Sequence, residues 1–164
     1  MTNTIPHYLF TETVRFVQKA IVLHPTSKKF LIIKRASTEF IRPNTWDIPG
    51  GSVHYGELHK DALQREIFEE TNLKVTSIKE INVITGYDQN KPMYFIIIGS
   101  VCLATSTNIT LSNEHGIYQW VTPEEYFNLN PEYTFIKDRL FDIHETNFIS
   151  DIIYLYQKGN FLLY

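Results

Sequence analysis

The sequence has almost no cysteine, no long apolar run and no strong excess of charge of either sign. Its one cysteine, Cys102, has no partner for an intramolecular disulfide, which excludes the small disulfide-stabilised scaffolds of secreted proteins. The longest apolar run, Phe95 to Ala104, is much shorter than the roughly 20 residues that a membrane-spanning helix needs. We therefore predict a buried Cys102 and no membrane segment.

The N-terminal residues, MTNTIPHYLF, lack the basic start and the sustained apolar stretch of a secretory signal, so we expect a cytoplasmic protein. Fifteen Lys and Arg residues against 18 Asp and Glu residues give a net charge of −3. A domain that binds duplex nucleic acid through its phosphates usually carries a clear positive excess. The charge balance predicts no duplex nucleic acid partner, and any polyanionic ligand would have to meet local positive charges.

The composition is that of an ordinary globular domain. Of the 164 residues, 43% are hydrophobic and 20% are charged, both close to the average for soluble proteins. A single domain typically contains roughly 100 to 200 residues. We therefore predict one domain over residues 1–164, with no internal repeat and no interdomain linker.

Several short runs are rich in β-branched and aromatic residues, which predicts strands. These runs cover residues 13–24, 29–35, 77–85, 93–104 and 117–121, with a short extended segment at 46–48. The run 29–35 is apolar almost throughout, which is typical of a strand covered on both faces.

Residues 58–71 contain neither Gly nor Pro and are rich in helix formers, which predicts a helix closed by Asn72. A second helix is expected after Thr122, because the Thr-Pro-Glu-Glu sequence there is an N-terminal capping pattern. Apolar residues at helical spacing predict one or two C-terminal helices over about 134–158. The expected fold class is α+β, with a mixed β-sheet packed between helices as an α/β/α sandwich.

Three glutamates, Glu66, Glu69 and Glu70, fall within one turn of the predicted helix. Since an α-helix turns by about 100° per residue, their carboxylates share one face. Such a cluster is either a solvated face or a site for a divalent cation that offsets the repulsion between the acids. Oxygen ligands suit Mg²⁺, and Mn²⁺ would also fit. The glycine pair Gly50–Gly51 before the helix lets the backbone come close to a bound ion or phosphate.

The spacing of these residues resembles the Nudix box. That pattern is Gly, five residues, Glu, seven residues, Arg-Glu, an aliphatic residue, any residue, Glu-Glu, any residue, Gly and an aliphatic residue. The matching positions here are Gly51, Glu57, Arg65, Glu66, Ile67, Glu69, Glu70 and Leu73. Only Asn72 departs from the pattern, at the place of the second glycine. Asn tolerates a left-handed backbone better than most residues, so the departure leaves the carboxylates unaffected.

The resemblance extends beyond the box. Family members commonly carry a basic residue after the second strand, and Lys34 and Arg35 stand there in this chain. They also share a Trp-x-x-Pro-Gly-Gly segment, here residues 46–51, and a later Glu near a Trp-Val pair, here Glu114 before residues 120–121. Roughly residues 14–128 therefore look like one Nudix domain.

The resemblance implies roles for individual residues. Glu66, Glu69 and Glu70 would be metal ligands, with the carbonyl of Gly50 as an additional one, and Arg65 would orient a catalytic glutamate. The base that takes the proton from water would be either Glu66 or Glu114.

Other residues keep two interpretations. Glu57 would either act directly in catalysis or hold the loop before the helix, where an acidic side chain also favours the helix dipole. Arg35 and Arg42 would either grip substrate phosphates or serve as surface charges. Three histidines near the site, His54, His59 and His115, have no metal-ligand spacing, and we assign them no metal role.

The activity implied is a hydrolase, dependent on Mg²⁺ or Mn²⁺, that cleaves a diphosphate bond in a nucleoside diphosphate linked to another group, including nucleoside triphosphates. The alternative is a Nudix-like module that binds a nucleotide without hydrolysing it. A P-loop NTPase is disfavoured because no Gly-x-x-x-x-Gly-Lys-Ser/Thr sequence occurs. The resemblance also makes a homodimer one of the expected assemblies.

Overall fold

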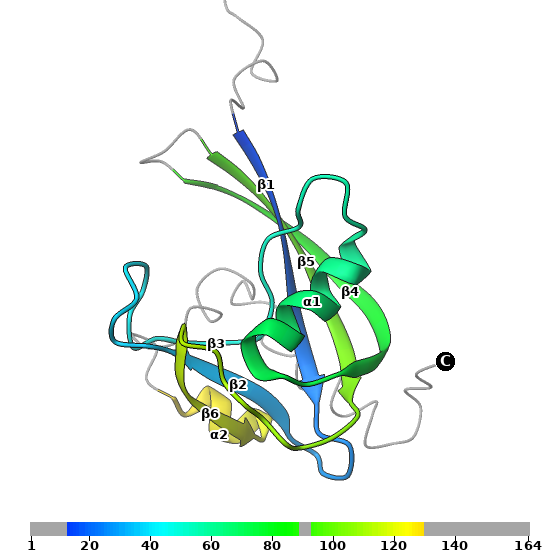
Figure 1. Cartoon of the computed structure of the whole chain (residues 1–164), viewed down its shortest axis with the longest axis vertical. Helices are drawn as coiled ribbons and strands as arrows, with labels where there is room; N and C mark the ends of the chain where they lie inside the picture. Colours follow the sequence, from blue (N-terminus) through cyan, green and yellow to red (C-terminus); the bar gives the residue numbers. More distant parts are fainter. Residues whose placement is uncertain (1–12, 89–92, 130–164) are drawn as a thin grey trace, which may run out of the picture.

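The computed structural model describes residues 13–88 and 93–129, which form a mixed β-sheet with a helix on one face (Figure 1). Within these residues the sheet has six strands in the order β3-β2-β1-β5-β4, and β6 pairs with β2 at the side. The strands are β1 (Thr13–Leu23), β2 (Phe30–Arg35), β3 (Trp46–Asp47), β4 (Val75–Asp88), β5 (Met93–Ala104) and β6 (His115–Val121). Strand β1 runs parallel to β5, and the other pairs are antiparallel, so the predicted mixed sheet is confirmed.

Helix α1 (His59–Thr71) lies across the sheet, and in Figure 1 it crosses in front of β1 and β5. Asn72 closes it in the left-handed conformation, with φ of 58°, and the Asn72 N–H donates to the Phe68 carbonyl. This is the helix and the closing residue that the sequence predicts. Asn72 therefore does the conformational work of the glycine that the box pattern has at this position.

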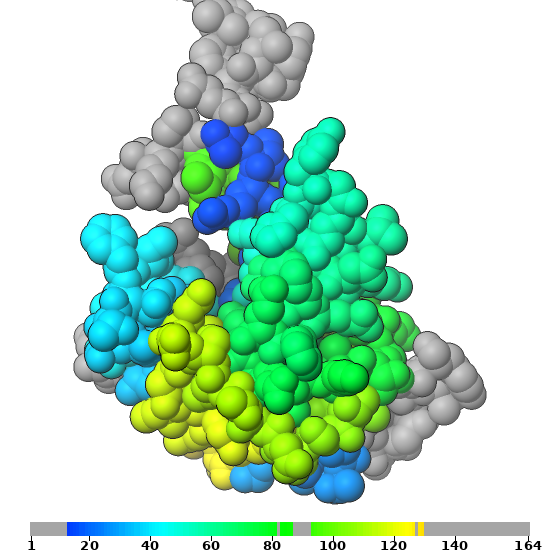
Figure 2. Space-filling model, viewed as in Figure 1, coloured from blue at the N-terminus to red at the C-terminus, as the bar shows by residue number. Residues whose placement is uncertain are grey.

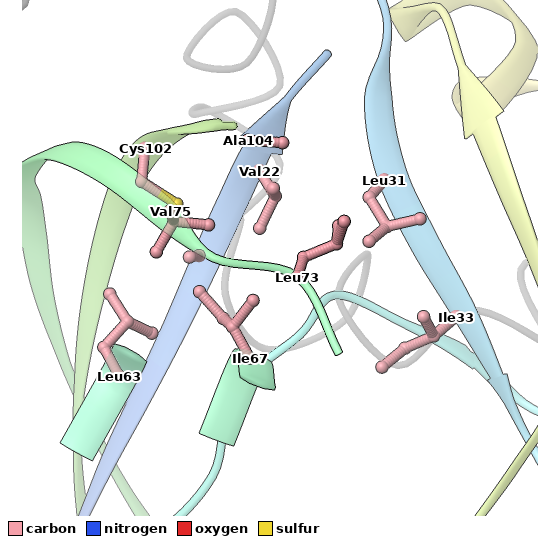
Figure 3. Packing of buried hydrophobic residues seen from close by; sticks show 10 residues of the cluster. Val22, Leu31, Ile33, Leu63, Ile67, Leu73, Val75, Cys102 and Ala104 are labelled. Carbon is pink, nitrogen blue, oxygen red and sulfur yellow. The ribbon is translucent and has the colours of Figure 1, made fainter. Parts of the chain in front are cut away.

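Two clusters of buried residues cover the two faces of the sheet. On the α1 face, Leu63 and Ile67 of the helix point at strand residues (Figure 3). The strand and loop members of this cluster are Ala20, Val22, Leu31, Ile33, Leu73, Val75, Cys102 and Ala104. Strand β2 contributes alternate residues to both clusters, so it is buried on both faces, as its apolar sequence predicts.

The opposite face carries the second cluster. Helix α2 (Pro123–Phe127) begins at Thr122 with the predicted capping box and inserts Tyr126 next to Phe30. Cys102 is fully buried and its thiol is free, which confirms its predicted packing role, and burial raises its pKa. The C-terminal helices predicted over about 134–158 lie outside the described residues. Among the residues that are described, no helix has both the length and the apolar character needed to cross a bilayer.

The segment that follows β3 runs along β1 and is fixed to it by backbone hydrogen bonds. The Ala20 N–H donates to the Pro49 carbonyl (3.0 Å) and the Gln18 N–H donates to the Gly51 carbonyl (2.8 Å). The N–H of Gly50, between these two anchors, donates instead to Glu70 Oε2 (2.8 Å). The sheet therefore sets the position of the glycine pair on which the site is built.

A buried ion pair between Lys19 and Asp47 also ties this segment to β1. The Lys19 ammonium donates to Asp47 Oδ2 and to the Ile48 carbonyl, both at 3.0 Å. The side chains are 10% and 2% exposed, so both charges are shielded from water. A charged residue inside an apolar strand is costly unless it is paired, and this pair explains why β1 tolerates Lys19.

We expect Lys19→Met to destabilise the protein by about 3 kcal/mol, because Asp47 would remain buried without its ammonium partner. Chemical denaturation measures this loss. Lys29→Met removes an exposed ion pair with Glu125 and should cost less than about 1 kcal/mol, which makes it the matched control. Replacing both partners, as Lys19→Met with Asp47→Leu, should restore part of the stability. A double variant less stable than Lys19→Met would contradict this account.

Candidate active site

The guanidinium of Arg65 forms hydrogen bonds with several acidic residues of the site. Its Nε and Nη2 donate to the two carboxylate oxygens of Glu57 at 2.8 and 2.9 Å. Its Nη2 also donates to the Ser52 carbonyl at 3.0 Å. Its Nη1 donates to Glu66 Oε1 at 2.9 Å and to Glu69 Oε2 at 3.0 Å. Arg65 therefore links the loop before α1 to two glutamates on the helix.

Like Arg65, Glu57 holds the loop before α1 in place. Its carboxylate accepts a hydrogen bond from the His54 N–H (3.0 Å) in addition to the two from Arg65. These bonds, above all those from Arg65, lower the pKa of Glu57 from 4.5 to about 2. The contacts agree with the loop-holding role that the sequence suggests for Glu57.

Glu66 is the glutamate that lies against the glycine pair. A Cβ added to Gly51 would lie 2.4 Å from the Glu66 carboxyl carbon, so only glycine leaves room for this carboxylate. A Cβ on the neighbouring Gly50 would lie 2.2 Å from the Gln18 carbonyl oxygen, and Gly50 has φ of 126°, a conformation that other residues rarely adopt. The two glycines are needed for different reasons, because Gly50 faces the sheet and Gly51 faces the Glu66 carboxylate.

Glu70 points into the interior, whereas Glu69 is 57% exposed. Glu70 Oε2 accepts a hydrogen bond from the Gly50 N–H at 2.8 Å, and its Oε1 lies 3.7 Å from His115 Nε2. Burial raises the pKa of Glu70 to about 8, and the nearby charge of Lys19 works in the opposite direction. A cation next to Glu70 would favour its charged form.

The donor atoms suit a divalent cation, although the side chains are held by protein groups. Across residues 13–88 and 93–129, no three acidic, histidine or cysteine side chains already surround one point where an ion would bind. Arg65 holds Glu66 and Glu69, while Gly50 holds Glu70. Each glutamate nevertheless keeps one carboxylate oxygen that accepts no hydrogen bond from the described residues. Such hard oxygen donors are the ones that Mg²⁺ and Mn²⁺ prefer.

The two arginines considered for phosphate binding lie on or near the loop over residues 36–45. Arg35 donates from Nε to the Ile41 carbonyl (2.8 Å) and from Nη2 to Glu39 (2.6 Å), so these groups brace the loop. Arg42 lies 3.8 Å from the buried Asp47 carboxylate. Figure 2 shows this loop, in cyan, projecting from the surface beside a hollow that separates it from the teal segment leading into α1.

The candidate base Glu114 is exposed, and its backbone carbonyl accepts a hydrogen bond from the Ala36 N–H (2.8 Å). The residue after it, His115, is buried and contacts Glu70, a contact that sequence reasoning did not find. Burial lowers the pKa of His115 to about 4, so its imidazole is neutral at neutral pH. No spacing in the sequence connects these positions, because they meet only through the fold.

The fold and this arrangement of acids agree with a comparison against known families. A model of the NUDIX domain matches residues 15–142, which is most of the chain. The chain therefore belongs to the Nudix family of hydrolases, in which dependence on a divalent metal ion is general.

Similar proteins of known type support the same assignment. The nucleoside triphosphatase NudI of Salmonella arizonae is 31% identical over 112 residues, which are 62% of this chain and 79% of that protein. NudI of an Enterobacter species is 32% identical over 110 residues, 62% of this chain and 78% of that protein.

Solved structures confirm the predicted fold. A MutT Nudix hydrolase from Burkholderia pseudomallei has a TM-score of 0.61 at 22% identity, covering 70% of this chain and 87% of that one. A MutT protein from Methanosarcina mazei has a TM-score of 0.60 at 21% identity, covering 91% and 96%.

We expect the stabilising effect of Glu57 to depend on pH. Because its pKa is lower in the folded protein than in the unfolded chain, its contribution is complete above about 4.5 and is lost as the pH falls toward about 2. Glu57→Gln should therefore have a lower melting temperature than the wild-type protein at neutral pH, and the two melting temperatures should converge in acid. Calorimetry from pH 7 to pH 2 measures the difference. A gap that stays constant over this range would contradict the assignment.

We expect Gly51→Ala to fold normally and to lose activity. The new methyl group would collide with the flexible end of Glu66 rather than with backbone, so the carboxylate moves while the fold is kept. Gly50→Ala, in contrast, would collide with the β1 backbone and should not fold stably. Gly86→Ala, where no atom lies within 4 Å of the added Cβ, is the control. Melting temperature and turnover together separate the three cases, and full activity in Gly51→Ala would contradict the role of Glu66.

Proposed function

We propose that this protein hydrolyses nucleoside triphosphates, or related nucleoside diphosphate derivatives, in the presence of Mg²⁺ or Mn²⁺. One observation supports the proposal above all. Glu66 and Glu70 each contact one residue of the glycine pair that is anchored to the sheet, and Arg65 holds the neighbouring glutamates by hydrogen bonds. The similarity to nucleoside triphosphatases supports the choice of substrate class.

The metal ion would be held by Glu66, Glu69 and Glu70 together with the carbonyl of Gly50. When bound, it supplies positive charge that offsets the negative charge developing on the phosphate oxygens during attack by water. Arg65 keeps Glu66 and Glu69 oriented toward the site and, with all its N–H groups engaged, does not itself bind substrate.

Two glutamates are candidates for the base that removes the proton from the attacking water. Glu66 lies inside the site and is tied to Arg65, whereas Glu114 is exposed on the segment next to His115. Arg35 and Arg42 are proposed to bind the substrate phosphates, with Arg35 exchanging its contact to Glu39 for one to a phosphate oxygen.

A binding module that does not hydrolyse its nucleotide is the competing function. Such a module has no need of several acids oriented around one guanidinium next to a glycine pair. The presence of this complete set favours hydrolysis. A cytoplasmic location, the absence of a duplex nucleic acid partner and a homodimeric assembly stay predictions from the sequence.

The proposed function is tested with a panel of nucleotides and nucleotide sugars, Mg²⁺ or Mn²⁺, and separation of the products. We expect hydrolysis of a nucleoside triphosphate, and the pair of products, either monophosphate with pyrophosphate or diphosphate with phosphate, identifies the bond cleaved. Glu69→Gln and Glu70→Gln should each lower turnover about 100-fold or more while the protein stays folded.

Glu80→Gln is the matched control, because Glu80 lies outside the site and pairs with His59 and Lys60 on the surface. It should keep wild-type turnover. Nucleotide binding without any turnover across the panel would favour the non-hydrolytic module, and wild-type turnover in both Gln variants would refute the metal-ligand assignment.

A further inference from the structure

His115, the first residue of β6, is 5% exposed although the four residues after it are exposed. A buried polar side chain is expected to have a specific partner, because leaving it unpaired away from water is costly. The residues that His115 contacts therefore indicate its role.

A β-bulge turns His115 toward helix α1. In the β2–β6 pairing, Lys34 faces Ile117 but Arg35 faces His115, so Gly116 is an extra residue without a partner. Strict alternation would put residues 115 and 117 on the same face of the sheet. The bulge instead places His115 on the face that carries α1, and bulges beside active sites commonly redirect a side chain in this way.

On that face the imidazole lies between Glu70 and Ser112. Its Nε2 is 3.7 Å from Glu70 Oε1, and its Nδ1 is 3.4 Å from the Ser112 hydroxyl. The Gly50 N–H already holds the other oxygen of Glu70 at 2.8 Å. Both oxygens of this carboxylate are therefore approached by nitrogen atoms from segments far apart in the sequence.

The segment before His115 is also fastened to the end of α1. The Ser112 N–H donates to the Glu70 carbonyl and the Thr110 N–H to the Thr71 carbonyl, both at 3.0 Å. The His115 N–H donates to the Ser112 carbonyl at 3.2 Å. Figure 2 shows this segment, in yellow-green, directly beside the green of α1. Glu114, the candidate base, lies within this fastened segment.

We propose that His115 is a positioning residue that holds the Glu70 carboxylate, and the segment carrying Glu114, in the arrangement that binds the metal ion. This inference rests on the proposed function, because it gives His115 a role through a proposed metal ligand. Partners of this kind orient metal ligands in many sites, and their loss commonly weakens metal affinity by about 10 to 100-fold.

The test is a titration with Mn²⁺ in the absence of substrate, followed by the electron paramagnetic resonance signal of the free ion. His115→Phe keeps the ring volume but removes both nitrogens, and we expect its Mn²⁺ affinity to fall about tenfold. His115→Gln keeps an N–H donor that we expect to lie near the place of Nε2, and its affinity should stay within about threefold of wild type. His59→Phe is the matched control: His59 lies on the helix that carries Glu70 but contacts the carboxylate of Glu80 in β4, outside the site, so the Mn²⁺ affinity should not change.

The outcomes separate the two proposals. A wild-type protein that binds no Mn²⁺ would refute the proposed metal dependence itself. If the wild-type protein binds Mn²⁺ and His115→Phe binds it with equal affinity, the role of His115 alone would be overturned. An equal loss of Mn²⁺ affinity in His115→Phe and His115→Gln would also overturn it. If circular dichroism shows that His115→Phe does not fold, Ser112→Ala takes its place: removing the hydroxyl next to Nδ1 should weaken Mn²⁺ binding, and an unchanged affinity would overturn the proposal.

Discussion

The guanidinium of Arg65 is the interaction on which the rest of the site depends. A guanidinium has five N–H donors, and the five hydrogen bonds of Arg65 go to Glu57, Glu66, Glu69 and the Ser52 carbonyl. Its contacts with the acids also raise its pKa, so it stays charged. A lysine at this position would carry the same charge but lacks the planar fork that bridges Glu57, and could not hold loop and helix together in this way.

The charges around Arg65 do not balance, because three carboxylates contact this one guanidinium. The defined positions of the box include four glutamates, Glu57, Glu66, Glu69 and Glu70, and Arg65 is the one basic residue among those positions. The nearby Lys19 is largely neutralised by Asp47. Glu70 is buried and has no ion pair to Arg65, and burial raises its pKa, so its charged form would gain most from a nearby positive charge. In the proposed function, a divalent cation would supply this charge without filling the space of a side chain.

The local features of this protein could be predicted from its sequence, and the long-range contacts could not. Composition was sufficient for α1 and for its closure at Asn72, and the apolar run of β2 predicted its burial on both faces. The pairing of Lys19 with Asp47 joins residues on different strands, so no short window contains it. The contact of His115 with Glu70 depends on an extra residue in β6, which alternation of apolar and polar residues does not reveal.

The glycine pair shows that a motif can be recognised in the sequence although the reason why each of its residues is required appears only in the structure. From the sequence, both glycines serve one purpose, a close approach of the backbone to an ion or phosphate. In the structure Gly50 is required by the sheet, since its conformation and its distance to the Gln18 carbonyl exclude a side chain. Gly51 is required by the helix, since the Glu66 carboxylate occupies the space that a side chain would fill. The site is therefore assembled where a sheet-anchored segment and α1 meet at two consecutive residues, and neither element alone defines its geometry.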